Sequence, residues 1–127
     1  MKEINRIELS PFRHYIKAGF ASIMTAHLYV PALNKKERRA ASMSDAVVTD
    51  LLQKKDGFQG LCFTDALAMK GAERNKQESP SVLALKAGND IALASNKLTK
   101  EIEAVKAAII DGTFSKDDIA SKCKKIS

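Results

Sequence analysis

The sequence predicts a parallel α/β fold made of three helix-then-strand units followed by further helices. Three segments carry helix start and stop signals, a short apolar run follows each of them, and glycine joins each helix to its run. Neighbouring parallel strands need a crossover connection, which a helix supplies. The regular alternation of helices and apolar runs therefore favours a parallel sheet.

The first and third helices are predicted from matching frames of the same length. Ser10-Pro11 opens the first helix and Ala18-Gly19 closes it, while Ser79-Pro80 and Ala87-Gly88 frame the third. Serine can cap the first free backbone N–H groups, proline suits the first helical position, and glycine adopts the left-handed conformation just past the end. Both segments are therefore expected to be short helices.

The second helix is predicted to start at Ser44, as its cap, and to end at Asp56-Gly57. Its apolar side chains share one face, as a helix packed on a sheet requires; they are Val47, Val48, Leu51 and Leu52. After the third unit, Thr99 is expected to cap one helix and Ser115 to open the last.

Three apolar runs are predicted to be strands: residues 21–26, 61–64 and 91–94. They are short and lack polar alternation, which is typical of strands buried on both faces. The polar stretches 34–43 and 70–78 follow the first two runs. They are expected to be the loops that lead from strand to helix.

Functional residues are expected at the carboxyl ends of the strands, where parallel α/β folds gather ligands and catalytic groups. The end of the first strand leads into Thr25 and His27, and Asp65 ends the second between apolar neighbours. A carboxylate at the rim of a core is costly unless it is paired or used. The pattern leaves two roles open for Asp65, a turn cap or a catalytic group.

Three polar residues at or near the strands also have more than one possible role or a structural one. His27 either hydrogen-bonds a loop or serves as a substrate contact or charge partner. Asn89 and Asp90 precede the third strand, which places them at the opposite face, so they are expected to be structural.

Composition excludes several classes of protein. The chain has 127 residues, 45% hydrophobic and 28% charged, which is typical of one globular domain. The net charge of +6 is spread along the chain without a binding motif, so no nucleic-acid partner is expected. No apolar run reaches membrane-spanning length, and residues 1–10 lack the apolar stretch of a signal peptide. The spacing of Cys62 and Cys123 matches no metal site, so no metal or cofactor is expected.

Two segments, residues 57–69 and 22–33, resemble the family 3 glycoside hydrolases, and more closely their bacterial β-N-acetylglucosaminidase branch. The resemblance also takes in residues 9–13, 42–52 and 87–90, in the order of the family. It implies that residues 1–127 are the C-terminal portion of the family's N-terminal barrel domain. The chain would then supply about the last three βα units of a TIM-type (β/α)8 barrel, plus its closing helices.

The same resemblance implies a function. Asp65 would be the nucleophile of a retaining hydrolysis of β-linked N-acetylglucosaminides that proceeds through a covalent glycosyl-aspartate. His27 and Met69 would line the sugar site. The substrate would be a glycan containing N-acetylglucosamine, such as one derived from peptidoglycan, and the parent enzyme would work in the bacterial cytoplasm or cell envelope.

One departure from the family matters. The Lys-His-Phe-Pro-Gly-His-Gly type segment, which supplies a His-Asp general acid/base in similar enzymes, has no match, and the only histidines are His14 and His27. The N-terminal half of the barrel is therefore an expected partner, and the isolated chain is expected to have little or no turnover.

Two alternatives come from other classes of protein. Phe63-Thr64-Asp65 followed by Met69 resembles the phosphate-accepting strand of receiver domains, although the acidic pair and the lysine of that family are not in place. The second alternative is a non-catalytic α/β module that self-associates, because three strands leave apolar edges and faces uncovered.

Overall fold

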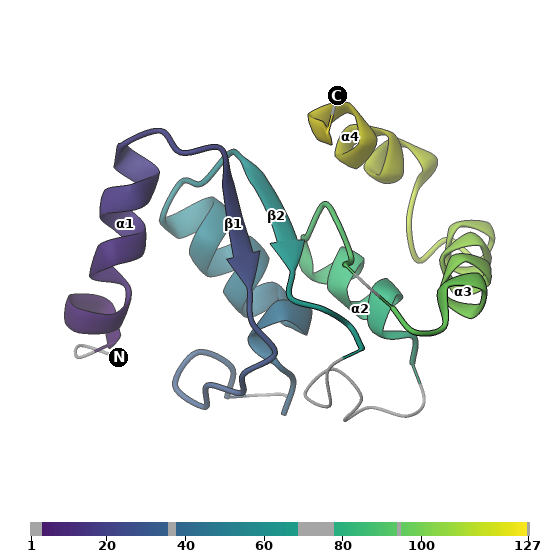
Figure 1. Cartoon of the computed structure of the whole chain (residues 1–127), viewed down its shortest axis with the longest axis horizontal. Coiled ribbons are helices and arrows are strands. Elements are labelled where there is room, and N and C mark those ends of the chain that lie inside the picture. Colours follow the sequence, from purple (N-terminus) through teal and green to yellow (C-terminus); the bar gives the residue numbers. More distant parts are fainter. Residues whose placement is uncertain (1–3, 36–37, 69–77, 94, 127) are drawn as a thin grey trace.

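The structure is a computed structural model that describes residues 4–35, 38–68, 78–93 and 95–126. It is an α/β fold in which helices flank a small parallel sheet and cover one of its faces (Figure 1). Along the chain the elements are η1 (Ile4–Glu8), α1 (Ser10–Lys17), β1 (Ser22–Thr25), η2 (Ala41–Met43), η3 (Ala46–Lys55), β2 (Leu61–Thr64), α2 (Pro80–Ala87), α3 (Leu98–Ile110) and α4 (Lys116–Ile126).

The sheet pairs β1 with β2 in parallel, with Ser22 opposite Leu61 and Thr25 opposite Thr64. Helix η3, which has π-helical hydrogen bonding, is the crossover between them and lies behind the strands in Figure 1. Alternate side chains of the strands point to opposite faces. Ile23 and Cys62 point into the main core cluster, which also contains Val48, Phe58 and Ala87. The prediction of a helix that packs on a parallel pair is confirmed.

The predicted third strand, residues 91–94, is reduced to one parallel bridge between Phe63 and Ile91, and Ala94 lies outside the described residues. The Thr64 N–H donates to the Ile91 carbonyl at 3.1 Å, as a parallel ladder requires. The next ladder bond is replaced, because the Leu93 N–H donates to the Thr64 hydroxyl oxygen at 3.0 Å. A side chain thus takes the place of a backbone acceptor, and regular pairing stops there.

The predicted helix stops are confirmed by positive φ angles at Gly19 (81°), Gly57 (73°) and Gly88 (120°). Fewer of the predicted N-terminal helix caps are confirmed. The Ser79 hydroxyl accepts the Val82 N–H at 3.3 Å, which confirms that cap.

Three predicted caps are wrong. Ser10 lies inside α1, because Leu9 before it already has helical dihedral angles and η1 runs almost directly into the helix. Asp45 rather than Ser44 accepts the first N–H of η3, while the Ser44 hydroxyl is buried and has no hydrogen-bond partner in the part of the chain that the structure describes. Helix α3 begins at Leu98, before Thr99.

Candidate active site

Asp65 directly follows β2, at the carboxyl end of the parallel pair, where the sequence placed it. Its N–H donates to the Thr25 carbonyl at 2.9 Å, so the two strands still hold each other at this point. Its Oδ1 accepts the Ala66 N–H at 2.8 Å. Among the described residues, Oδ2 has no hydrogen-bond partner. One oxygen therefore makes the local turn contact that the cap interpretation expects, and the other is left available.

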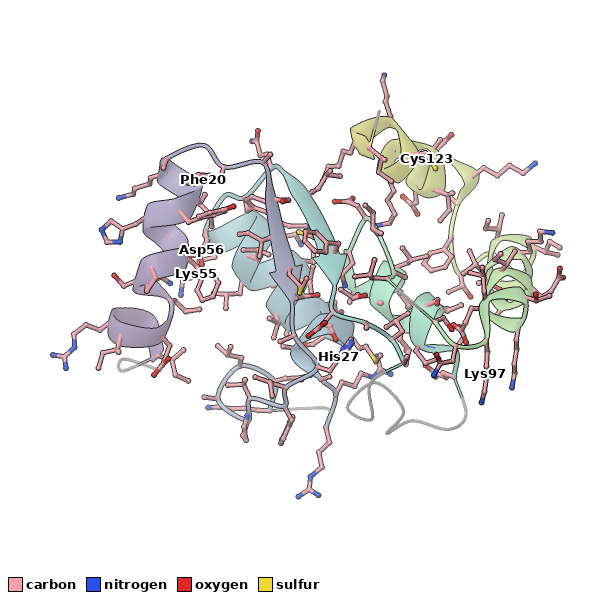
Figure 2. The ribbon with its side chains drawn as sticks, in the orientation of Figure 1. Phe20, His27, Lys55, Asp56, Lys97 and Cys123 are labelled. Atoms are coloured by element: carbon pink, nitrogen blue, oxygen red, sulfur yellow. The ribbon has the colours of Figure 1, made fainter. Side chains whose placement is uncertain are left out.

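His27 lies two residues past β1, below the arrowheads of the strands in Figure 2. Its Nε2 is 3.0 Å from the carbonyl oxygen of Asp65 and 3.0 Å from that of Ala66. Its Nδ1 is 2.7 Å from the hydroxyl oxygen of Ser42. Carbonyl oxygens only accept, so Nε2 carries the proton, and in the neutral ring Nδ1 accepts the Ser42 O–H. Both ring nitrogens are committed to the protein itself.

Ser42 and Asn89, both 0% exposed, join the site although neither was predicted to belong to it. The Ser42 N–H donates to the Ala26 carbonyl at 3.0 Å, and the Ser42 carbonyl accepts the Asn89 side-chain amide at 2.7 Å. The Thr25 hydroxyl donates to Asn89 Oδ1 at 2.8 Å. These bonds hold the ends of β1 and η2 together.

Asn89 is structural, as predicted, but its expected separation from the strand ends is wrong. Its side chain reaches Thr25, the last residue of β1, as well as the carbonyl of Ala84 at 2.8 Å. Asn89 lies two residues before the bridge between Phe63 and Ile91, and its side chain extends across to β1 and η2. A buried amide needs several partners, but the burial of this asparagine is visible only in the structure.

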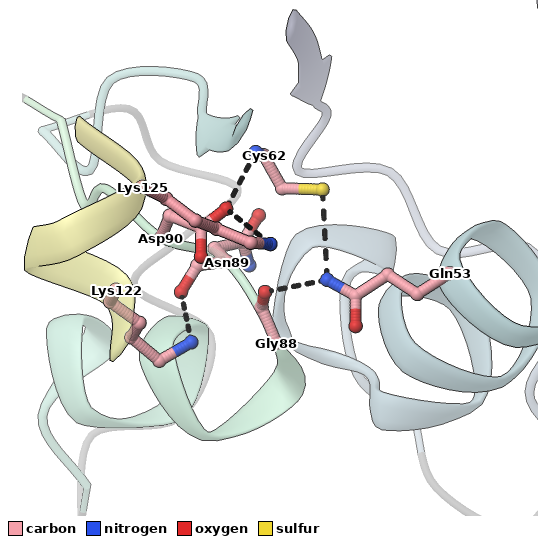
Figure 3. Close-up of polar contacts among 7 residues, drawn as sticks. All are labelled: Gln53, Cys62, Gly88, Asn89, Asp90, Lys122 and Lys125. Carbon is pink, nitrogen blue, oxygen red and sulfur yellow. Dashed lines mark hydrogen bonds and ion pairs between the residues drawn. The ribbon is translucent and has the colours of Figure 1, made fainter. Parts of the chain in front are cut away.

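Asp90 and two lysines hold helix α4 against the start of the third segment (Figure 3). Asp90 Oδ2 accepts the Cys62 N–H at 3.0 Å and lies 3.5 Å from Lys125 Nζ. Lys122 Nζ donates to the Asn89 carbonyl at 2.7 Å. Burial lowers the pKa of Lys122 and outweighs the opposing effect of Asp90. These contacts are structural, since they end on backbone atoms and a buried carboxylate.

Cys62 is also buried, and burial raises the pKa of its thiol, which disfavours the reactive thiolate. The described residues contain no group of three His, Cys, Asp or Glu side chains that could hold a metal ion. In the same part of the chain, no helix is both long and apolar enough to cross a bilayer. Met69, a predicted substrate contact, lies outside the described residues.

The comparisons with known proteins agree with this fold. All of residues 1–127 match the glycosyl hydrolase family 3 N-terminal domain, and the chain belongs to that family. The resemblance seen in the sequence is confirmed.

The relatives are glycosidases. The β-hexosaminidase of Chromobacterium violaceum is 34% identical over 110 residues, which are 86% of this chain and 30% of the relative. β-Hexosaminidase A of Pseudoalteromonas piscicida is 37% identical over 102 residues, 72% of this chain and 17% of the relative.

Solved structures of related enzymes have the same fold as this chain. The family 3 β-N-acetylglucosaminidase from Paenibacillus sp. str. FPU-7 superimposes with a TM-score of 0.91 at 30% identity, covering 98% of this chain and 24% of that one. The β-N-acetylglucosaminidase from Thermotoga maritima gives a TM-score of 0.87 at 26% identity, covering 98% and 28%. The chain thus spans less than a third of the length of these relatives.

Proposed function

We propose that this chain carries the nucleophile of a retaining glycosidase that hydrolyses β-linked N-acetylglucosaminides. The observation that supports this most is Asp65, which stands at the carboxyl end of a parallel strand with one carboxylate oxygen unpaired among the described residues. The substrate class is taken from the relatives, which are β-hexosaminidases and β-N-acetylglucosaminidases. The family match leaves the receiver-like alternative without support.

The proposed reaction has two steps. Oδ2 of Asp65 attacks the anomeric carbon while the bond to the leaving-group oxygen breaks, and a general acid gives that oxygen its proton. Water then attacks the glycosyl-aspartate, the same group accepts the proton of the water, and Asp65 leaves with its electron pair. Two inversions at one carbon give net retention. The Ala66 N–H donates a hydrogen bond to Oδ1. Such a bond is stronger to an ionised carboxylate than to a neutral acceptor, so it suits the nucleophile.

The general acid/base is proposed to lie outside these 127 residues. The sequence has two histidines. His14 belongs to α1 and its Nδ1 lies 2.8 Å from the Ser10 carbonyl of the same helix, while His27 has both nitrogens bonded to the protein. Loss of a general acid/base typically costs a factor of ~10² to 10⁴ in rate. The chain alone is therefore proposed to have little or no turnover.

We also propose that residues 1–127 are the C-terminal portion of a closed (β/α)8 barrel, about its last three βα units with the closing helices. Strand β1 has a sheet partner on one side only among the described residues. Met24, on the face of β1 away from the core, is 48% exposed, and Leu28 just beyond it is 66% exposed. The N-terminal half of a barrel would cover these side chains. The competing outcome is self-association through the same surface.

The sequence resemblance assigned sugar contacts to His27 and Met69. The bonds of His27 to the loop after β2 favour an indirect role for that residue. Met69 keeps its proposed role from the resemblance alone.

The test is a chimaera in which residues 1–127 replace the matching segment of the Paenibacillus enzyme, a graft supported by the TM-score of 0.91. The substrate is a dinitrophenyl N-acetyl-β-glucosaminide, whose leaving group needs no acid. We expect the chimaera to release dinitrophenol and Asp65→Asn to abolish the release. The matched control is Asp50→Asn on the exposed side of η3, which should keep the rate.

Mass spectrometry of the chimaera during slow turnover should find the glycosyl group on the peptide that contains Asp65. Full activity of Asp65→Asn would overturn the nucleophile assignment. Asp65-dependent turnover by the isolated chain, at the rate of its relatives, would overturn the proposed need for outside residues.

A further inference from the structure

We propose that His27 and Ser42 form a positioning clamp that fixes the peptide of Asp65 and so aims its carboxylate. This inference rests on the proposed function of Asp65, and it gives His27 a role different from the predicted sugar contact. The clamp consists of the Ser42 hydroxyl, the imidazole of His27 and the carbonyl oxygens of Asp65 and Ala66, joined at distances of 2.7, 3.0 and 3.0 Å.

The clamp acts where β2 stops. In an extended strand successive residues alternate in direction, so successive carbonyls point away from each other. Here the carbonyls of Asp65 and Ala66 both reach one N–H, that of His27 Nε2. The backbone must therefore turn at Asp65, and the imidazole holds the turn closed.

Ser42 supports the ring tautomer that the two carbonyls require. Its N–H is bonded to Ala26, its carbonyl to Asn89, and it is fully buried, so its hydroxyl has little freedom to move. When the hydroxyl donates to Nδ1, the proton of the neutral ring must sit on Nε2. The ring is then a donor towards the two carbonyls.

The geometry of the Asp65 peptide links this clamp to the carboxylate. The Asp65 N–H is held by Thr25, its carbonyl by His27, and its Oδ1 by the N–H of Ala66. That N–H belongs to the same peptide unit as the Asp65 carbonyl. If His27 releases the carbonyl, this peptide can rotate and withdraw the N–H from Oδ1. Oδ2 would then lose its fixed direction.

A direct sugar contact by His27 fits these observations less well. Nε2 already serves two acceptors and Nδ1 already faces a hydroxyl. A substrate hydroxyl would have to displace one of these partners. His27 is therefore a positioning residue that acts through Asp65.

The first test uses the chain itself. In ¹⁵N-detected NMR of residues 1–127, His27 should be the Nε2–H tautomer, and Ser42→Ala should reduce the share of that tautomer. Ser42→Thr, which keeps the hydroxyl, should restore it. A dominant Nδ1–H tautomer in the unmodified chain would overturn the clamp, even if Ser42→Ala does not fold.

The second test measures kinetics in the chimaera. A misplacement of about 1 Å in a reacting group can cost roughly a hundredfold in rate. Ser42→Ala and His27→Leu should therefore lower kcat by about ten- to a hundredfold with little change in KM. His27→Gln, whose amide can still donate, should recover part of the loss. His14→Gln on exposed α1 is the matched control and should keep the full rate.

The outcomes separate the two proposals. A raised KM with unchanged kcat would identify a sugar contact and overturn the clamp, as would an unchanged kcat in both Ser42→Ala and His27→Leu. If Asp65→Asn stays active while the tautomer and its response to Ser42→Ala are as expected, the nucleophile assignment fails and the hydrogen-bonded clamp remains a feature of the fold.

Discussion

Replacing Asn89 with alanine should lower the free energy of unfolding by about 3–5 kcal/mol, because this side chain is 0% exposed and makes three hydrogen bonds. The three hydrogen-bond partners of the Asn89 side chain are affected unequally by its removal. The Ala84 carbonyl keeps the backbone N–H of residue 89 at 3.2 Å, and the Thr25 hydroxyl can turn to the Phe63 carbonyl, now 3.5 Å away.

The Ser42 carbonyl has no such substitute among the described residues. An unsatisfied buried acceptor costs about 1–3 kcal/mol, and each of the other two bonds contributes about 1 kcal/mol. Their sum gives the expected range. This range comes from the hydrogen bonds alone.

The assay is urea unfolding of the chain, followed by circular dichroism at neutral pH. The matched control is Asn96→Ala, at an exposed position, which should stay within about 0.5 kcal/mol of the unmodified chain. A loss below about 1 kcal/mol for Asn89→Ala, with an unchanged denaturant slope, would refute the reasoning. It would mean that water or a shifted backbone satisfies the Ser42 carbonyl.

Two further predictions concern local geometry and pH. Gly60→Ala should cost about 3 kcal/mol, because a Cβ there would collide with the Ala21 carbonyl, which accepts a sheet hydrogen bond. Gly57→Ala, with φ of 73° and nothing within 4 Å, should cost only about 1 kcal/mol in urea unfolding, and equal losses would contradict this. Although burial works to raise the pKa of Glu101, hydrogen bonds from Ser79 and Ser81 outweigh it and hold the pKa below its ordinary value of 4.5. The folded-state pKa is thus the lower one, so this carboxylate stabilises the fold above pH 4.5 and the benefit disappears as the pH falls through the lowered value. Glu101→Gln should flatten the pH dependence of the unfolding free energy in that acidic range, whereas an unchanged profile would contradict the assignment.

The sequence predicted the scaffold of the fold well where one residue type decides the local conformation. Glycines at positive φ end α1, η3 and α2 as expected. Residues 61–64 form β2 with the predicted bounds, and the first predicted strand is trimmed to Ser22–Thr25. The third strand failed because the side chain of Thr64 competes with the backbone for Leu93. No local pattern reveals such a competition.

The candidate site was predictable only in part, for a related reason. Asp65 was predicted from its position directly after an apolar run, and a short stretch of sequence is enough to show that feature. Asn89 meets Ser42 across a separation of 47 residues, and His27 meets Asp65 across 38. Partners so far apart are chosen by the packing of β1, η2 and α2, so a serine and an asparagine with no motif of their own could not be assigned in advance.

There is a physical reason why Asp65 was predictable and its hydrogen-bond partners were not. A carboxylate that attacks a sugar must keep one oxygen free, so it cannot be held through both of its own oxygens, and the constraint must come from the backbone on either side. Thr25 supplies that constraint before Asp65, and His27 supplies it after. His27 in turn depends on Ser42, and Ser42 on Asn89. The residues proposed to aim Asp65 are therefore expected to be at least partly buried and distant in sequence, which are the properties that make them hard to recognise from sequence alone.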